Sequence, residues 1–163
     1  MCDNNLVILI GNPNVGKSSI FNRLTGDNQH TGKTVECAEG KLKCNKDICI
    51  VDLPGIYTLC AANAEEICSK NFLLQHKDAL VIVVVDGNNI YKSLTLIEEV
   101  SNITSNVIIC INQYKSATKS GTKINIDKLK EILKIPIVTT EATDRSSLDI
   151  LNNIINININ NHF

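Results

Sequence analysis

The segment at residues 11–18, Gly-Asn-Pro-Asn-Val-Gly-Lys-Ser, restricts the possible folds of this chain more than any other part of it. Its spacing, G-x-x-x-x-G-K-S, is that of a phosphate-binding loop, in which backbone N–H groups surround a phosphate chain. Such a loop needs a buried strand before it and a helix after it. The apolar run Leu6–Ile10 precedes it, and Ile20, Phe21 and Leu24 follow at helical spacing. Both flanks favour a true phosphate-binding loop over a chance glycine-rich turn.

The residues of this loop predict how it would hold a nucleotide. Gly11 and Gly16 allow the backbone to curl, and Lys17 places a positive charge near the β and γ phosphates. The Ser18 hydroxyl can bind Mg²⁺, and the helix that follows points its positive N-terminus at the same phosphates. The nucleotide-binding residues expected here are Gly11, Asn12, Asn14, Val15, Gly16, Lys17, Ser18 and Ser19.

Length and composition narrow the class of protein. The chain has 163 residues, of which 44% are hydrophobic, and this suits one domain with a proper core. A net charge of −1 without a basic stripe argues against a nucleic-acid-binding protein. No run of apolar residues is long enough to cross a bilayer, and the N-terminus lacks a signal-peptide pattern. We expect a single cytoplasmic domain over residues 1–163 that does not itself contact a membrane.

The cysteines are expected to be reduced thiols that fill small apolar spaces. Their number is odd, and no two form a C-x-x-C pair. A zinc site made by Cys37, Cys44 and Cys49 is the alternative, although their spacing matches no usual ligand pattern. The seven cysteines are Cys2, Cys37, Cys44, Cys49, Cys60, Cys68 and Cys110.

Alternating apolar runs and helical segments predict an α/β fold. The strands are expected at Leu6–Ile10, Ile48–Val51, Ala79–Val85, Val107–Ile111 and Ile135–Val138. The helical segments between them include Ala64–Gln75, Ser93–Val100 and Asp127–Leu133. This order predicts a parallel sheet with helices on both faces. Val35–Lys43 and Asp47–Val51, joined by a turn at Asn45-Lys46, predict a hairpin that adds one antiparallel edge strand.

Two details concern the C-terminal helices. Asp127 is expected to cap its helix, with Leu129, Ile132 and Leu133 facing inward. The alternation of Ile and Asn at residues 154–161 is expected to continue the last helix rather than to form a strand.

A second functional segment follows the edge hairpin, where Asp52-Leu53-Pro54-Gly55 ends a predicted strand. An aspartate there, followed by a glycine turn, is typical of a nucleotide switch, and its order after the phosphate-binding loop favours a switch over an ordinary turn. Asp52 would hold Mg²⁺, directly or through water, and the Gly55 N–H would sense the γ-phosphate. Thr34, with Thr31 as the competing candidate, would complete the Mg²⁺ shell when that phosphate is present.

The base would be bound beyond the next two strands. Asn112-Gln113-Tyr114-Lys115 ends one strand, and Asn112 would bond the edge of a purine and tie this loop to the phosphate-binding loop. After the following strand, Thr140-Glu141-Ala142 would offer backbone N–H groups to guanine O6. The residues expected at the base are Asn112, Gln113, Lys115, Thr140, Glu141 and Ala142.

The order of GNPNVGKS, GKTVE, DLPGIYTL, NQYK and TEA resembles the G domain of the ferrous iron transport protein B (FeoB) family over almost the whole chain. The resemblance implies a Ras-like P-loop GTPase fold, with a mostly parallel six-stranded sheet and one antiparallel edge strand. It also implies binding of GTP or GDP with Mg²⁺, and GTP hydrolysis coupled to Fe²⁺ uptake. The partners implied are the helical and membrane parts of an iron transporter, and the location implied is the cytoplasmic face of the inner membrane.

The resemblance also assigns roles to single residues. Lys17 and Ser18 match the phosphate and Mg²⁺ residues, Thr34 the first switch and Asp52 the second. Asn14 matches an asparagine that helps hold K⁺ beside the phosphates in related GTPases, and a structural turn is its other reading. The K⁺ ion would offset charge between the β and γ phosphates. Lys17, Thr34, Gly55 and Asn14 are thus the expected catalytic residues.

Position 56 bears on the rate of hydrolysis. Many GTPases keep a glutamine here that orients the attacking water, and this chain, like the FeoB family, has an apolar residue, Ile56. The water must then be placed by backbone groups of the first switch or by a partner. Turnover by the isolated chain is therefore expected to be slow.

Position 115 bears on base specificity. The family pattern is N-x-x-D, and its aspartate accepts hydrogen bonds from N1–H and N2–H of guanine. This chain has Lys115 instead, which only donates, and no acidic residue lies close to it in sequence. The sequence alone therefore predicts weaker GTP binding with poorer discrimination from ATP, and tighter GTP binding after Lys115→Asp.

Two other functions fit parts of the pattern. An Era-like ribosome-assembly GTPase shares the phosphate-binding loop and the D-x-P-G turn, but such proteins usually carry an RNA-binding domain or a basic face. A nucleotide sensor that does not hydrolyse its ligand is favoured by Ile56 and Lys115.

Overall fold

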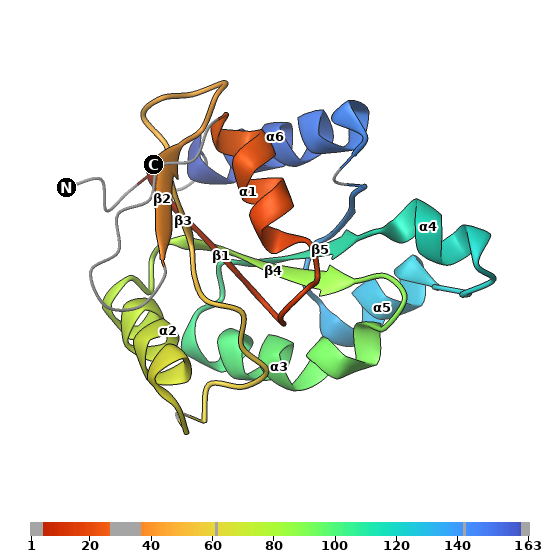
Figure 1. Ribbon diagram of the computed structural model, residues 1–163, viewed down its shortest axis with the longest axis horizontal. Coiled ribbons are helices and arrows are strands. Elements are labelled where there is room, and N and C mark those ends of the chain that lie inside the picture. Colours follow the sequence, from red (N-terminus) through yellow and green to blue (C-terminus); the bar gives the residue numbers. More distant parts are fainter. Residues whose placement is uncertain (1–4, 27–36, 61, 142, 161–163) are drawn as a thin grey trace.

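The sheet at the centre of the molecule has the predicted pattern (Figure 1). The computed structural model describes residues 5–26, 37–60, 62–141 and 143–160. The strand order is β2-β3-β1-β4-β5-β6, with β2 antiparallel to β3 and every other neighbouring pair parallel. The strands are β1 (Leu6–Gly11), β2 (Ala38–Lys41), β3 (Cys49–Asp52), β4 (Leu80–Asp86), β5 (Val107–Asn112) and β6 (Ile137–Thr139).

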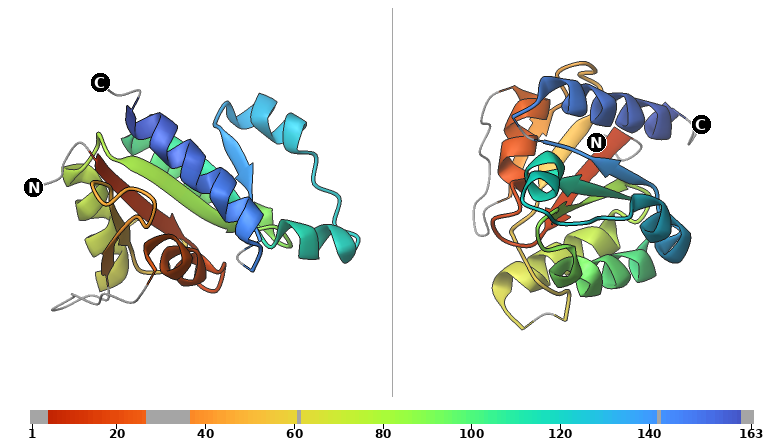
Figure 2. Two further views of the ribbon diagram at one scale, coloured as in Figure 1. Left: turned by 90° about the horizontal axis from the view of Figure 1, so that it is seen from above. Right: turned by 90° about the vertical axis from the view of Figure 1, so that its right-hand side faces the viewer.

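Helices cover both faces of this sheet. They are α1 (Lys17–Thr25), α2 (Ala64–Gln75), the short 3₁₀ helix η2 (Ile90–Ser93), α3 (Leu94–Ile103), α4 (Tyr114–Lys119), α5 (Ile126–Leu133) and α6 (Arg145–Asn160). Figures 1 and 2 show α1 and α6 on one face, and α2, α3 and α5 on the other. None of the helices in the described part of the chain combines the length and the apolar composition that crossing a membrane requires.

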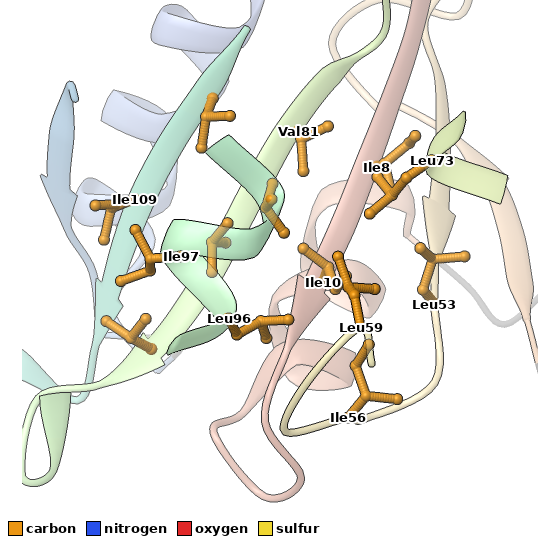
Figure 3. Packing of buried hydrophobic residues seen from close by; sticks show 14 of the residues in the cluster. Ile8, Ile10, Leu53, Ile56, Leu59, Leu73, Val81, Leu96, Ile97 and Ile109 are labelled. Carbon is orange, nitrogen blue, oxygen red and sulfur yellow. The ribbon is translucent and has the colours of Figure 1, made fainter. Parts of the chain in front are cut away.

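The central strands are buried on both faces, which explains their continuous apolar sequences. Every residue of β1 and of β5 is buried. Along β1, Ile8 and Ile10 face α2 and α3, where they join Leu96 and Ile97 (Figure 3). Leu9 faces the opposite way, toward α1 and α6. Because β1, β3, β4, β5 and β6 are parallel, the loops after them meet at one edge of the sheet, where such folds bind ligands.

Most helices and strands lie where the sequence predicts them, and the main differences concern α4 and α5. The helix predicted at Ala64–Gln75 has those bounds, and the tail from residue 154 continues α6 as far as Asn160. The expected cap of α5 is wrong, because Asn125 rather than Asp127 accepts a hydrogen bond, from the Lys128 N–H at 2.9 Å. The inward placement of Ile132 is also wrong, since this side chain is 63% exposed. Helix α4 was not predicted, because its six residues carry no apolar periodicity.

Candidate nucleotide-binding site

The phosphate-binding loop joins β1 to α1, as its sequence predicts. Gly16 has φ = 85°, a left-handed conformation that glycine adopts without strain. A Cβ atom at Gly16 would lie 2.3 Å from Nδ2 of Asn112, and one at Gly11 would lie 2.3 Å from the Val84 carbonyl oxygen. Both positions therefore require glycine, because neighbouring atoms occupy the space that a side chain would need. Asn14 also has a positive φ, 64°, which asparagine tolerates better than most residues.

Lys17, Ser18 and Asp52 come together at the end of this loop. The buried Lys17 ammonium donates hydrogen bonds to the Asp52 carboxylate and to the Leu53 carbonyl. Ser18 Oγ lies 3.1 Å from Oδ2 of Asp52. Pairing of β3 with β1 places Asp52 beside Leu9, and so next to the loop. A hydroxyl and a carboxylate side by side are hard oxygen ligands, which suit Mg²⁺.

Lys17 and Ser18 line a cavity of about 590 Å³. Its volume is within the range of pockets that hold small-molecule ligands and cofactors, roughly 300 to 1,000 Å³. Gly55 reaches the rim because it has no side chain, since a Cβ there would lie 3.0 Å from Cα of Pro13. The residues that line the cavity are Asn12, Pro13, Asn14, Gly16, Lys17, Ser18, Gly55 and Glu65.

Glu65 is the lining residue that the sequence analysis missed. It lies in the first turn of α2, where an acidic residue is ordinarily explained by the helix dipole. Its neighbour Glu66 has a structural role at the start of the helix, because its carboxylate accepts a hydrogen bond from the Ala62 N–H at 2.8 Å. The local sequence therefore gave no signal that separated Glu65 from Glu66.

The segment after Asp52 is anchored beneath the cavity. The Leu53 N–H donates to the Leu9 carbonyl at 3.0 Å, and the Ile56 N–H donates to the Gly11 carbonyl at 3.1 Å. The Ile56 side chain is 2% exposed and packs into the core shown in Figure 3. Because the Ile56 side chain points into the core and not into the cavity, an apolar residue suits this position.

Two expected base-site residues connect the loops after β1, β5 and β6. Asn112 Nδ2 donates to the Val15 carbonyl at 2.9 Å, which is the link between the base loop and the phosphate-binding loop that the sequence predicts. Thr140 Oγ1 lies 3.3 Å from Oδ1 of Asn112. Gln113 turns away from these groups, with φ = 57° and its Oε1 atom 3.4 Å from Nδ2 of Asn88. Asn112 is therefore the residue that fixes the three loops relative to one another.

The surroundings of Lys115 correct one premise of the sequence analysis. Its ammonium donates to the carboxylate of Asp144, which lies 29 residues away along the chain. Glu141 Oε2 is also near, 3.4 Å from the Ser116 N–H. The hydrogen bond from Lys115, with two more from Ser146, lowers the pKa of Asp144 to about 2. Acidic groups therefore do surround position 115, although none is close to it in sequence.

Three other predicted site residues lie outside the part of the chain that the structure describes. Thr34, its competitor Thr31 and Ala142 are outside the described residues. Ser19 is exposed on α1, immediately after Ser18.

The cysteines only partly follow the expected apolar role. Cys110 does, since it is fully buried and burial raises its pKa to about 12. Cys44 and Cys60 are exposed, so they do not fill apolar space. Within residues 5–26, 37–60, 62–141 and 143–160, no three metal-binding side chains come together, so Cys37, Cys44 and Cys49 form no zinc site there.

A contact from α3 holds the segment that follows Ile56. Glu99 accepts hydrogen bonds from the Thr58 hydroxyl at 2.7 Å, the Leu59 N–H at 2.6 Å and the Cys60 thiol at 3.3 Å. Partial burial opposes ionisation of Glu99, but these hydrogen bonds hold its pKa below the ordinary value. The ionised carboxylate of Glu99 therefore holds residues 58–60 in place.

Glu99→Gln is expected to lower the free energy of unfolding by about 1 kcal/mol at neutral pH, the value of a lost charged hydrogen bond at a partly exposed site. A lowered folded pKa stabilises the protein above the unfolded pKa, about 4.3, and this contribution disappears as the pH falls through the folded value. Urea denaturation at pH 7 and below pH 4 should thus show the difference shrinking in acid. Glu98→Gln, at the exposed neighbouring position, is the control and should change little.

Comparison with known proteins identifies the family. Residues 5–155 match the family model of ferrous iron transport protein B. The Fe(2+) transporter FeoB of Helicobacter pylori is 36% identical over 151 residues, which are 90% of this chain but 23% of that protein. The chain thus spans less than a quarter of that relative.

Solved structures agree with this match. The FeoB G-domain from Methanococcus jannaschii superposes with a TM-score of 0.85 at 34% identity, covering 96% of this chain and 97% of the other. An NFeoB variant of S. thermophilus bound to GDP and AlF4⁻ gives a TM-score of 0.82 at 34% identity, covering 96% and 64%. The fold is thus that of a Ras-like P-loop GTPase, and the chain belongs to the ferrous iron transport protein B family as its G domain.

Proposed function

We propose that this chain binds GTP and GDP with Mg²⁺, hydrolyses GTP slowly, and serves as the nucleotide switch of a ferrous iron transporter. The observation that carries the proposal is that Lys17 and Ser18, both bonded to Asp52, line a cavity large enough for a phosphate chain. The S. thermophilus relative bound to GDP and AlF4⁻ supports it.

The phosphate chain would lie along the loop of residues 11–19. The backbone N–H groups of Gly11, Asn12, Val15, Gly16 and Ser19, and of the residues between them, would donate to its oxygens. An ammonium has three donors. Asp52 and the Leu53 carbonyl take two of those of Lys17, which leaves one for a phosphate oxygen.

Mg²⁺ would be held by Ser18 and Asp52, whose oxygens lie side by side, and Thr34 would join them when the γ-phosphate is present. When bound, the ion would neutralise charge on the phosphate oxygens. Asn14 and Gly55 both line the cavity. Asn14 would contribute a ligand for K⁺, and the Gly55 N–H would donate to the γ-phosphate.

The base would lie over the loops after β5 and β6. Asn112 and Gln113 would approach it from one side, and Thr140, Glu141 and Ala142 from the other. The hydrogen bond of Asn112 to the Val15 carbonyl supports this arrangement, because it joins the base loop to the loop that would hold the phosphates.

Hydrolysis by the isolated chain is expected to be slower than about 1 s⁻¹, the lower end of the usual enzyme range. The reason is that Ile56 is buried and no side chain at that position can orient water. Phosphate release under single-turnover conditions, with K⁺ and with Na⁺ as the control, measures the rate. K⁺ should accelerate release, and a rate above about 1 s⁻¹ in Na⁺ would refute this account.

The burial of Ile56 also favours a second function, that of a sensor that binds nucleotide without hydrolysing it. The same assay decides between the two, because a sensor would release no phosphate in either salt. In the transporter, the partners would be its helical and membrane parts, and this domain would lie on the cytoplasmic side. An Era-like role finds no support in the charge of the chain, which is −1.

A further inference from the structure

The ion pair between Lys115 and Asp144 joins the two loops over which the base would lie. Lys115 is in the first turn of α4, directly after β5, and Asp144 precedes α6 in the loop after β6. Asp144 is held from both sides, since its Oδ1 accepts from the Ser146 N–H at 3.0 Å and from the Ser146 hydroxyl at 2.8 Å. The carboxylate is therefore fixed beside the end of the Lys115 side chain.

Position 115 is where a FeoB-like N-x-x-D pattern would place its carboxylate, and here the carboxylate of Asp144 contacts the end of the Lys115 side chain from another loop. Lys115, Asp144 and Glu141 together carry a net charge of −1, the charge that a single aspartate would supply. The Asp144 side chain is 26% exposed and that of Lys115 is 61% exposed, so both are open to a ligand.

Asp144 also keeps capacity to accept a further hydrogen bond. A carboxylate has about four acceptor positions, and the contacts with Lys115 and Ser146 use three. The position that the described residues leave free is on Oδ2, the oxygen that Lys115 contacts. Glu141 is the less favoured candidate, because one hydrogen bond, from the Ser116 N–H, holds its carboxylate, whereas three hold that of Asp144.

We infer that Asp144, positioned by Lys115, is the carboxylate that accepts a hydrogen bond from the 2-amino group of guanine. This rests on the proposed function, because it presumes that a nucleotide binds at this site. Guanine presents a donor at this position, whereas adenine has no 2-amino group. The chain would then keep a preference for guanine despite Lys115. Lys115→Asp would place a third carboxylate beside two others, so it would not tighten GTP binding as the sequence alone suggests.

The test compares binding of GDP with binding of inosine diphosphate, which lacks the 2-amino group, by calorimetry with millimolar Mg²⁺. The wild-type protein should prefer GDP roughly tenfold, and Asp144→Asn should reduce this ratio to about threefold or less. Lys115→Met should also lower the ratio, whereas Lys115→Arg should retain it. Asp149→Asn, the same change at an exposed position of α6, is the control and should leave it unchanged.

The outcomes separate this inference from the function on which it rests. An unchanged ratio in Asp144→Asn, or its collapse in Glu141→Gln alone, would overturn the role of Asp144. A wild-type preference for GDP over inosine diphosphate near one would also overturn the role of Asp144. If the wild-type protein bound neither ligand, the proposed function itself would fail. Thermal unfolding of each variant verifies that the change in ratio does not come from misfolding.

Discussion

Lys17→Met is expected to lower the free energy of unfolding by about 3 kcal/mol, as well as to weaken nucleotide binding. The Lys17 and Asp52 side chains are only 8% and 7% exposed, and the lysine ammonium is the charge that balances the carboxylate. Removing it leaves Asp52 buried, and the Ser18 hydroxyl is then its side-chain hydrogen-bond partner among the described residues. Urea denaturation of the wild-type protein and the variant, without added nucleotide, measures the loss.

A double variant separates the two consequences of this change. Lys17→Met combined with Asp52→Asn removes the buried negative charge, so at least half of the lost stability should return. Nucleotide binding should not return, because the phosphate chain would still lack the Lys17 ammonium. Equal losses of stability in the single and double variants would show that the pair does not stabilise the fold.

Ile56→Gln is expected to destabilise the protein by about 3 to 5 kcal/mol without accelerating hydrolysis. A glutamine here restores the residue that orients water in many GTPases, but the side chain at position 56 is 2% exposed and points into the core (Figure 3). The change therefore removes apolar burial and places an amide among aliphatic side chains. Denaturation and single-turnover phosphate release, measured on the same preparation, follow both effects.

Tyr57→Gln provides the matched control, because the neighbouring Tyr57 is 58% exposed. It should change stability by no more than about 0.5 kcal/mol. A faster rate of hydrolysis in Ile56→Gln, with stability preserved, would mean that this side chain can turn toward the cavity, and the burial argument would then be wrong.

The sheet and the phosphate side of the site were predictable from sequence because their signals are local. The apolar run ending at Ile10 and the glycines of residues 11–18 specify a strand, a loop and a helix within one stretch of chain. The spacing of Asp52 from that loop then placed it correctly beside Ser18. The residues that build the phosphate side of the site are therefore the same residues whose sequence pattern predicts it.

The base side depends on contacts between distant segments, and the sequence was less informative there. Lys115 was interpreted from its sequence neighbours, but its partner Asp144 comes from the loop after the next strand. Ile56 is buried within an irregular segment after β3, and such a segment has no periodic pattern from which burial could be predicted. The nucleotide roles of Thr34 and Ala142, outside the described residues, remain predictions.

A calorimetric titration of the full chain with GDP in millimolar Mg²⁺ tests whether the loop at residues 11–18 holds a phosphate chain. Saturable binding by the wild-type protein is expected, with one nucleotide per chain. Binding weakened at least about tenfold is expected in the folded Lys17→Met, Asp52→Asn double variant, which loses both the charged hydrogen bond of Lys17 and the proposed Mg²⁺ ligand Asp52. No heat of binding in the wild-type protein, or equal affinities in the two proteins, would contradict the claim that Lys17 and the loop around it hold a phosphate chain.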